Sequence, residues 1–185
     1  MNRKKQASIL RTTRKIHRYL GISLFLLFLI VSLSGLLLGW KKDSGGYILP
    51  KTQRGTTTEL SQWLSIDSLQ TIAKKTVLDS INYKLSTEIA RIDARPSKGI
   101  VKFLFEDHFW GIQLDAATGQ ILSIGQRRSD WIENIHDGSI LDDFFGSNGV
   151  IKLIYTSVMG LALLGFTVTG FWLWYGPKRM RKTRS

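Results

Sequence analysis

The chain has 185 residues, no cysteine and a formal net charge of +12. Without cysteine, these residues can form no disulfide, thiolate metal site or thiol nucleophile. So basic a composition suggests nucleic-acid binding, but the distribution of charge argues against it. The whole excess of positive charge lies in two short tails, residues 1–18 and 178–185, and the stretch between them has no net charge. Each tail adjoins an apolar run, so we expect no nucleic-acid partner.

Two apolar runs predict membrane-spanning helices, over residues 19–40 and 150–175. About 20 helical residues cover a hydrocarbon core of about 30 Å. The aromatic residues Tyr19, Trp40 and Trp174 mark their ends, as expected at the headgroup level. A cleaved signal peptide would be shorter than the first run. Because basic segments stay inside, both termini are expected in the cytoplasm and the central domain in the periplasm.

The residues between the two runs predict a small α+β domain. Ser65 is a candidate N-cap for an amphipathic helix. Four short segments with alternating polarity follow, at 88–93, 100–106, 109–114 and 120–124, and predict an antiparallel meander. A further helix is expected over 129–140. The organisation expected in chain order is a basic cytoplasmic tail (1–18), a first transmembrane helix (19–40), a linker (41–64), the α+β domain (65–128), an amphipathic connecting helix (129–149), a second transmembrane helix (150–175) and a basic cytoplasmic tail (176–185).

The sequence has three histidines as candidate functional residues. His17 precedes the first apolar run and His136 precedes the second. His108 lies beside Glu106 in the strand region, where a solvated strand end is the simplest interpretation and a catalytic dyad the alternative. No phosphate-binding, dinucleotide-binding or hydrolase motif is present.

Two motifs resemble a known family. The stretch WGIQLDAATGQIL (110–122), with its D-x-x-T-G turn, resembles the hairpin of a PepSY domain. RKIHRYLG (14–21), and His136-Asp137-Gly138 before a run ending in TGFWLW (169–174), resemble the PepSY-associated transmembrane family. The resemblance implies an α+β protein of the bacterial inner membrane, with two transmembrane helices flanking a small extracytoplasmic PepSY-like domain. Such proteins are often linked to iron uptake.

Longer members of that family have four or more spans, and some look like haem-containing ferric-siderophore reductases. This chain resembles half of that arrangement, so a homodimer would be needed to rebuild a four-helix core. The likeness raises the hypothesis that haem b is the cofactor, with His17 and His136 as ligands of the haem iron and Arg14 and Arg18 as propionate partners. Because the two histidines should lie at opposite membrane faces, bis-histidine ligation would pair each with its copy in a homodimer. His17 is explained equally well as an interfacial histidine.

The leading functional prediction is haem-linked transmembrane electron transfer in ferric-siderophore acquisition, as a possible reductase component. Whether the chain is itself an enzyme stays open. The expected partners are the lipid bilayer, a second copy, and a ferric siderophore or an envelope protein. The alternative is a non-enzymatic, membrane-anchored PepSY module that binds or regulates an envelope peptidase or a transporter. A third hypothesis is a metal sensor at the outer face of the membrane, with His136, Asp137, Asp142 and Asp143 as metal ligands.

Overall fold

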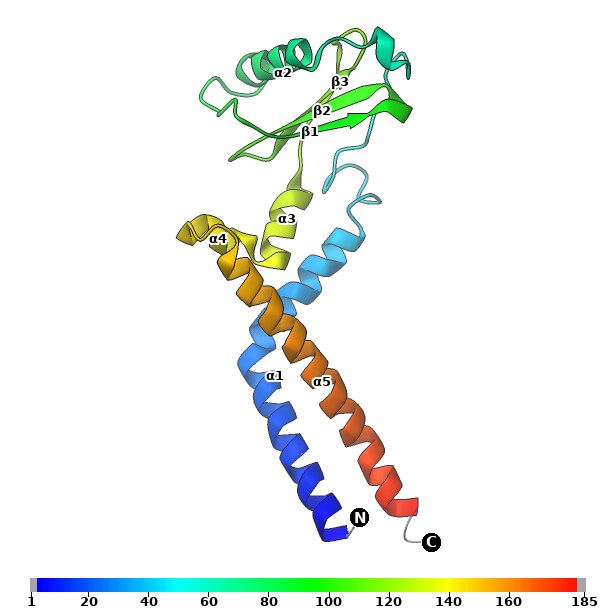
Figure 1. The fold of residues 1–185 in the computed structure, drawn as a ribbon, viewed down its shortest axis with the longest axis vertical. Coiled ribbons are helices and arrows are strands. Elements are labelled where there is room, and N and C mark those ends of the chain that lie inside the picture. The colour runs from blue at the N-terminus through cyan, green and yellow to red at the C-terminus, as the bar shows by residue number, and fades with distance from the viewer. Residues whose placement is uncertain (1–2, 183–185) are drawn as a thin grey trace. The chain divides into compact units, whose positions relative to one another are not determined.

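The computed structural model describes residues 3–182. Residues 1–2 and 183–185, which belong to the two predicted basic tails, lie outside the described residues. The chain divides into two compact units. The helical unit combines the residues up to Leu36 with those from Glu133 onward, and the sheet unit covers Leu37–Ile132. Figure 1 shows the ribbon of both.

Two long helices dominate the helical unit, α1 (Arg3–Gly39) and α5 (Val150–Lys182). Both are long and apolar enough to cross a membrane. Large apolar side chains stay exposed along both, such as Ile22 on α1 and Leu161 on α5, each 71% exposed. A helix that is apolar all round is typical of a membrane span, where lipid covers it. The α1 helix begins within the predicted basic tail, because Arg, Lys and Gln are good helix formers.

Two short helices, α3 (Arg128–Asp137) and α4 (Ser139–Phe145), precede α5. The helix predicted over 129–140 is present as α3 but ends at Asp137, and the connecting segment predicted over 129–149 contains two helices instead of one. Gly138 separates the two with a φ of 80°, in the left-handed region that favours glycine. A Cβ at Gly138 would also lie 2.6 Å from Cδ1 of Tyr155, so glycine is needed for space as well as conformation. The chain therefore turns at Gly138 instead of continuing as one helix.

The sheet unit contains one four-stranded antiparallel sheet in the order β1-β2-β3-β4. The strands are β1 (Ile89–Arg95), β2 (Ile100–Phe105), β3 (Trp110–Asp115) and β4 (Ile121–Gln126). This confirms the predicted meander. Helix α2 (Ile66–Ser80) lies over one face of the sheet (Figure 1). Two short 3-10 turns complete the unit, η1 (Leu60–Gln62) and η2 (Pro96–Lys98).

The apolar core of the sheet unit lies between α2 and this face of the sheet. Ser65 caps α2 as predicted, its hydroxyl accepting the backbone N–H of Ser68 at 3.1 Å. Because side chains alternate along a strand, every second residue of β2 points into the core. Buried in this core are Leu69, Ala73, Val77, Val101, Phe103, Phe105, Ile112, Leu114 and Ala116.

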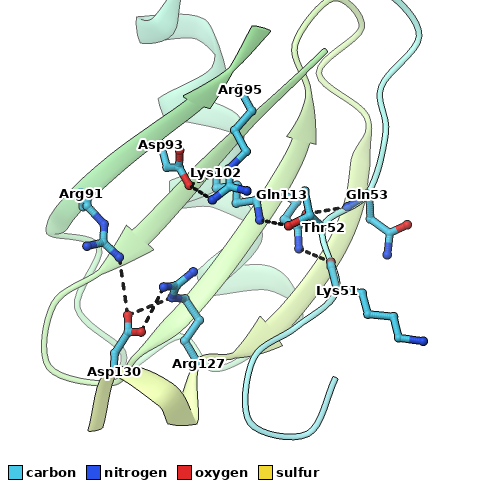
Figure 2. A network of polar contacts seen from close by, with 10 residues as sticks. All are labelled: Lys51, Thr52, Gln53, Arg91, Asp93, Arg95, Lys102, Gln113, Arg127 and Asp130. Atoms are coloured by element: carbon cyan, nitrogen blue, oxygen red, sulfur yellow. Dashed lines mark hydrogen bonds and ion pairs between the residues drawn. The ribbon is translucent and has the colours of Figure 1, made fainter. Parts of the chain in front are cut away.

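The predicted linker packs against the sheet through polar contacts (Figure 2). The backbone N–H of Gln53 donates to Oε1 of Gln113 on β3 at 3.0 Å, and Nε2 of Gln113 donates to the carbonyl of Lys51 at 2.8 Å. The backbone N–H of Thr56 donates to Oδ2 of Asp115 at 2.8 Å. These contacts cover the face of the sheet opposite α2.

Asp115 is the acid of the predicted D-x-x-T-G turn, and its side chain is 1% exposed. Its Oδ1 accepts the backbone N–H groups of Ala117 at 2.9 Å and Thr118 at 3.2 Å. Burial alone would raise its pKa, but these bonds and those from Thr56 hold the pKa of Asp115 below its ordinary value. The acid of this motif thus joins the hairpin turn to the linker.

Candidate functional site

His17 projects from α1 towards α5 within the helical unit. Its Nδ1 lies 2.8 Å from Oγ1 of Thr169, and its ring centroid lies 4.0 Å from that of Phe166. A Cβ at Gly170 would lie 3.5 Å from Cε1 of His17, so the ring is in ordinary van der Waals range of this position. The contacts of this imidazole with α5 are therefore a polar one to Thr169 and an aromatic one to Phe166.

The hydroxyl of Thr169 determines which nitrogen of His17 carries the proton. This hydroxyl donates to the carbonyl of Gly165 at 2.7 Å, one helical turn back. A hydroxyl has one proton, so towards His17 its oxygen acts as the acceptor. We therefore assign the proton of the neutral imidazole to Nδ1, which leaves a lone pair on Nε2.

His136 on α3 repeats this arrangement against α1. Its Nδ1 lies 2.9 Å from Oγ of Ser34, and that hydroxyl donates to the carbonyl of Ile30 at 2.7 Å. A Cβ at Gly35 would lie 3.3 Å from Cε1 of His136. Ser34 is 6% exposed, so the contact is shielded from water. The same assignment follows, with the proton on Nδ1 and a lone pair on Nε2.

The two sites share one pattern, a hydroxyl residue followed by glycine that holds a histidine from another helix. A neutral imidazole held through Nδ1 can offer Nε2 to a metal, and such partners typically orient metal-binding histidines. His17 and Ser34 are 17 positions apart on α1, which at about 1.5 Å per residue separates the two sites by roughly 25 Å. The two histidines are therefore too far apart to share one metal ion.

The acids near His136 bind other groups. Asp137 forms an ion pair with Lys152 and accepts a hydrogen bond from the backbone N–H of Ser139. Asp142 accepts the backbone N–H groups of Ile151 at 3.0 Å and Lys152 at 2.9 Å, in the first turn of α5. Among the described residues, no group of three or more His, Cys, Asp or Glu side chains could hold a metal ion. Asp142 therefore caps the first turn of α5, and Asp137 is occupied by Lys152 and Ser139.

The other predicted residues lie apart from these contacts. Arg14 and Arg18 are exposed on α1, and within the described part of the chain neither forms an ion pair with an acid. His108 lies in the turn between β2 and β3, where Nε2 contacts the carbonyl of Ser86 at 3.0 Å. Glu106 is exposed, and the structure gives no hydrogen bond between its carboxylate and His108. His108 therefore has a local role in the turn.

Sequence reasoning missed Ser34 and Thr169. Both positions are hydroxyl residues directly followed by glycine within an apolar run. That dipeptide could have marked both positions as candidates for a contact between helices, because a lone hydroxyl inside a span usually bonds to its own helix or to a neighbouring one. The partner histidine cannot be identified this way, since it lies more than 100 positions away in both cases.

The family model described as "PepSY-associated TM region" matches residues 14–185. The chain therefore belongs to the PepSY-associated transmembrane family and is a membrane protein with an α+β fold. No curated protein and no solved structure shows significant similarity to it. The family match covers both histidine sites and the whole sheet unit.

Proposed function

We propose that this protein carries electrons across the bacterial inner membrane in ferric-siderophore acquisition, with haem b as its cofactor. One observation carries the proposal: His17 and His136 are each held through Nδ1 by a hydroxyl that is itself bonded to its helix, which assigns the lone pair of the neutral ring to Nε2. Nε2 of a neutral imidazole is an established ligand of haem iron. When bound, haem would supply a one-electron couple between ferric and ferrous iron.

The surrounding residues fit such a group. Thr169 and Ser34 fix the tautomer and the ring orientation of the two histidines, as partners of a metal-binding imidazole do. Arg14 and Arg18 lie within one turn of His17 and are exposed, so their guanidinium groups are available to pair with propionate carboxylates. The separation of roughly 25 Å along α1 suits one site near each membrane face.

The proposal requires a homodimer. Within the described residues, His17 and His136 are the histidines of the helical unit, and they lie at different levels of α1. Two imidazoles at one level would therefore need a second copy of the chain to hold the haem together. Exposed apolar side chains along α1 and α5 are compatible with a four-helix bundle in which each histidine faces its copy. With both termini cytoplasmic, electrons would pass from the level of His17 to that of His136.

The test is the absorption spectrum of the detergent-purified protein, oxidised and then reduced with dithionite. We expect a Soret band with sharp reduced α and β bands, altered or lost in His17→Ala and in His136→Ala. His108→Ala is the matched control, because His108 lies in the sheet unit and should leave the spectrum unchanged. A wild-type protein that stays colourless after haem supplementation would exclude electron transfer and leave the alternative, a membrane-anchored PepSY module that binds an envelope peptidase or a transporter.

A further inference from the structure

Helix α4 has an apolar side that stays exposed. Successive residues of a helix are rotated by about 100° about its axis, so residues three or four positions apart share a side. The apolar side of α4 is formed by Ile140, Leu141, Phe144 and Phe145, and the polar side by Ser139, Asp142 and Asp143. Phe144 is 80% exposed and Phe145 is 64% exposed, and their rings meet edge to face with centroids 5.0 Å apart. Two adjacent aromatic rings left open in this way indicate an interaction surface.

The polar side of α4 is bound to the beginning of α5. Asp142 is buried and accepts the backbone N–H groups of Ile151 and Lys152, and the hydroxyl of Ser147 also donates to it. Gly146 ends α4 with a φ of 64°, so α4 lies beside the start of α5 and does not continue into it (Figure 1). The apolar side, opposite Asp142, is thereby left open.

The first turn of α5 also marks the boundary of the membrane span. After Lys152, the chain has no charged residue until Lys178. The apolar side chains of Val150 and Leu153 are exposed in this turn, as the side chains of a span that lipid covers would be. Because Asp142 bonds to the same turn, α4 lies at the level where α5 enters the bilayer. Aromatic side chains favour this level, between the headgroups and the acyl chains.

We propose that α4 is an interfacial anchor, whose apolar side inserts into the lipid leaflet at the N-terminal end of α5. Lipid is the occupant that the position favours, because the open side of α4 adjoins apolar side chains of α5 that the bilayer covers. Asp143, on the polar side, is exposed and would stay among the headgroups. The proposal goes beyond electron transfer and does not depend on it, since no histidine takes part.

An anchored α4 would also restrain the helix that carries His136. Gly138 joins the end of α3 to the beginning of α4, and His136 lies two positions before it. Fixing the depth of α4 in the leaflet would therefore limit the movement of His136 along the membrane normal.

The experiment is site-directed spin labelling of the full-length protein in vesicles of phosphatidylcholine and phosphatidylglycerol. The chain has no cysteine, so each single-cysteine variant carries one nitroxide. Power saturation compares collisions with oxygen, which concentrates in the bilayer, and with a water-soluble nickel chelate. We expect a severalfold higher oxygen-to-nickel ratio in Phe144→Cys and Phe145→Cys than in Asp143→Cys, the matched control on the polar side. The exposed positions of Leu161→Cys on α5 and Asp79→Cys on α2 supply the lipid and water references.

A second set of variants tests the aromatic pair itself. With the nitroxide on Leu141→Cys, changing both phenylalanines to glutamine (Phe144→Gln, Phe145→Gln) should lower the oxygen-to-nickel ratio towards the water reference, whereas Asp143→Asn should not. Both rings are exposed, so their removal should leave the circular dichroism spectrum unchanged.

A ratio close to that of the lipid reference at positions 144 and 145, lost at position 141 in the double glutamine variant, would support the anchor. A ratio equal to the water reference would overturn it, because the apolar side would then be hydrated. Low collision rates with both reagents would also overturn it, because protein would then cover this side. In that case spin–spin broadening would identify a second copy as the cover, and its absence another part of the same chain.

Discussion

The two units of this protein use polar and apolar residues in opposite ways. In the sheet unit, apolar residues such as Phe103 are buried, and Asp115 joins the turn to the linker. In the helical unit, Leu161 is 71% exposed while Ser34 is 6% exposed. Water drives burial in the first case, whereas lipid covers apolar side chains in the second, so that polar contacts hold the helices together. Truncation of an apolar side chain should therefore cost much more stability in the sheet unit than in the helical unit.

Loss of a core aromatic residue should have the largest effect on stability. Phe103→Ala should lower the local free energy of unfolding of the sheet unit by about 4 kcal/mol, because it removes buried apolar surface and leaves a cavity. The measurement is hydrogen–deuterium exchange of β2 and β3 amides in the full-length protein. Leu161→Ala should leave exchange in α5 nearly unchanged. Equal effects of the two changes would refute the contrast between the units.

Removal of the acid in the hairpin turn should have the next largest effect. Asp115→Ala leaves the backbone N–H groups of Thr56, Ala117 and Thr118 without their acceptor, which should cost about 3 kcal/mol. The same exchange experiment measures it, with the exposed Asp79→Ala as the control. A loss no greater than that of Asp79→Ala would show that water replaces the carboxylate.

The wild type should also show the acid sensitivity of this carboxylate. The pKa of Asp115 is lowered in the folded state from its ordinary value of 3.8. Its contribution to stability is therefore complete above that value and is lost as the pH falls through the folded pKa. Exchange measured between neutral and acid pH should show a smaller acid-induced loss in Asp115→Asn than in the wild type. An identical pH profile would contradict this role.

The cap of α2 should have an intermediate effect. Ser65→Ala removes the acceptor of the Ser68 backbone N–H and should cost about 1 kcal/mol. The loss should appear in the exchange of the first turn of α2, and Ser65→Asp should restore it, since aspartate is also a good N-cap. A failure of aspartate to rescue would indicate that the hydroxyl acts through another contact.

The smallest expected effect concerns the histidine contact in the helical unit. A double-mutant cycle of Ser34→Ala and His136→Phe should give a coupling energy of about 0.6 kcal/mol, typical of hydrogen bonds between membrane helices. Unfolding in a denaturing detergent, followed by circular dichroism, measures it. A parallel cycle of Thr169→Val and His17→Phe should give a similar value. Zero coupling in both cycles would contradict the proposed anchoring of the imidazoles.

Local patterns predicted the spans, the Ser65 cap and the strands, because side-chain periodicity and capping depend on neighbouring residues. Contacts between residues far apart in the chain leave no such pattern in the sequence. The linker gave no sign that Thr56 would bind Asp115, 59 positions away. The break at Gly138 depends on the ring of Tyr155, which belongs to another helix. The histidines were predicted as candidates, but their hydroxyl partners were not, because a serine or threonine in a span usually needs no partner beyond its own helix.

The central claim is that the two hydroxyl-held histidines are two separate haem-ligand positions. The most direct measurement is the amount of haem per chain, determined on the detergent-purified wild type, His17→Ala, His136→Ala and His108→Ala. We expect about one haem per chain in the wild type and in His108→Ala, and about half of that in each of the other two variants. Full occupancy in His17→Ala and in His136→Ala, or no haem in the wild type, would contradict it.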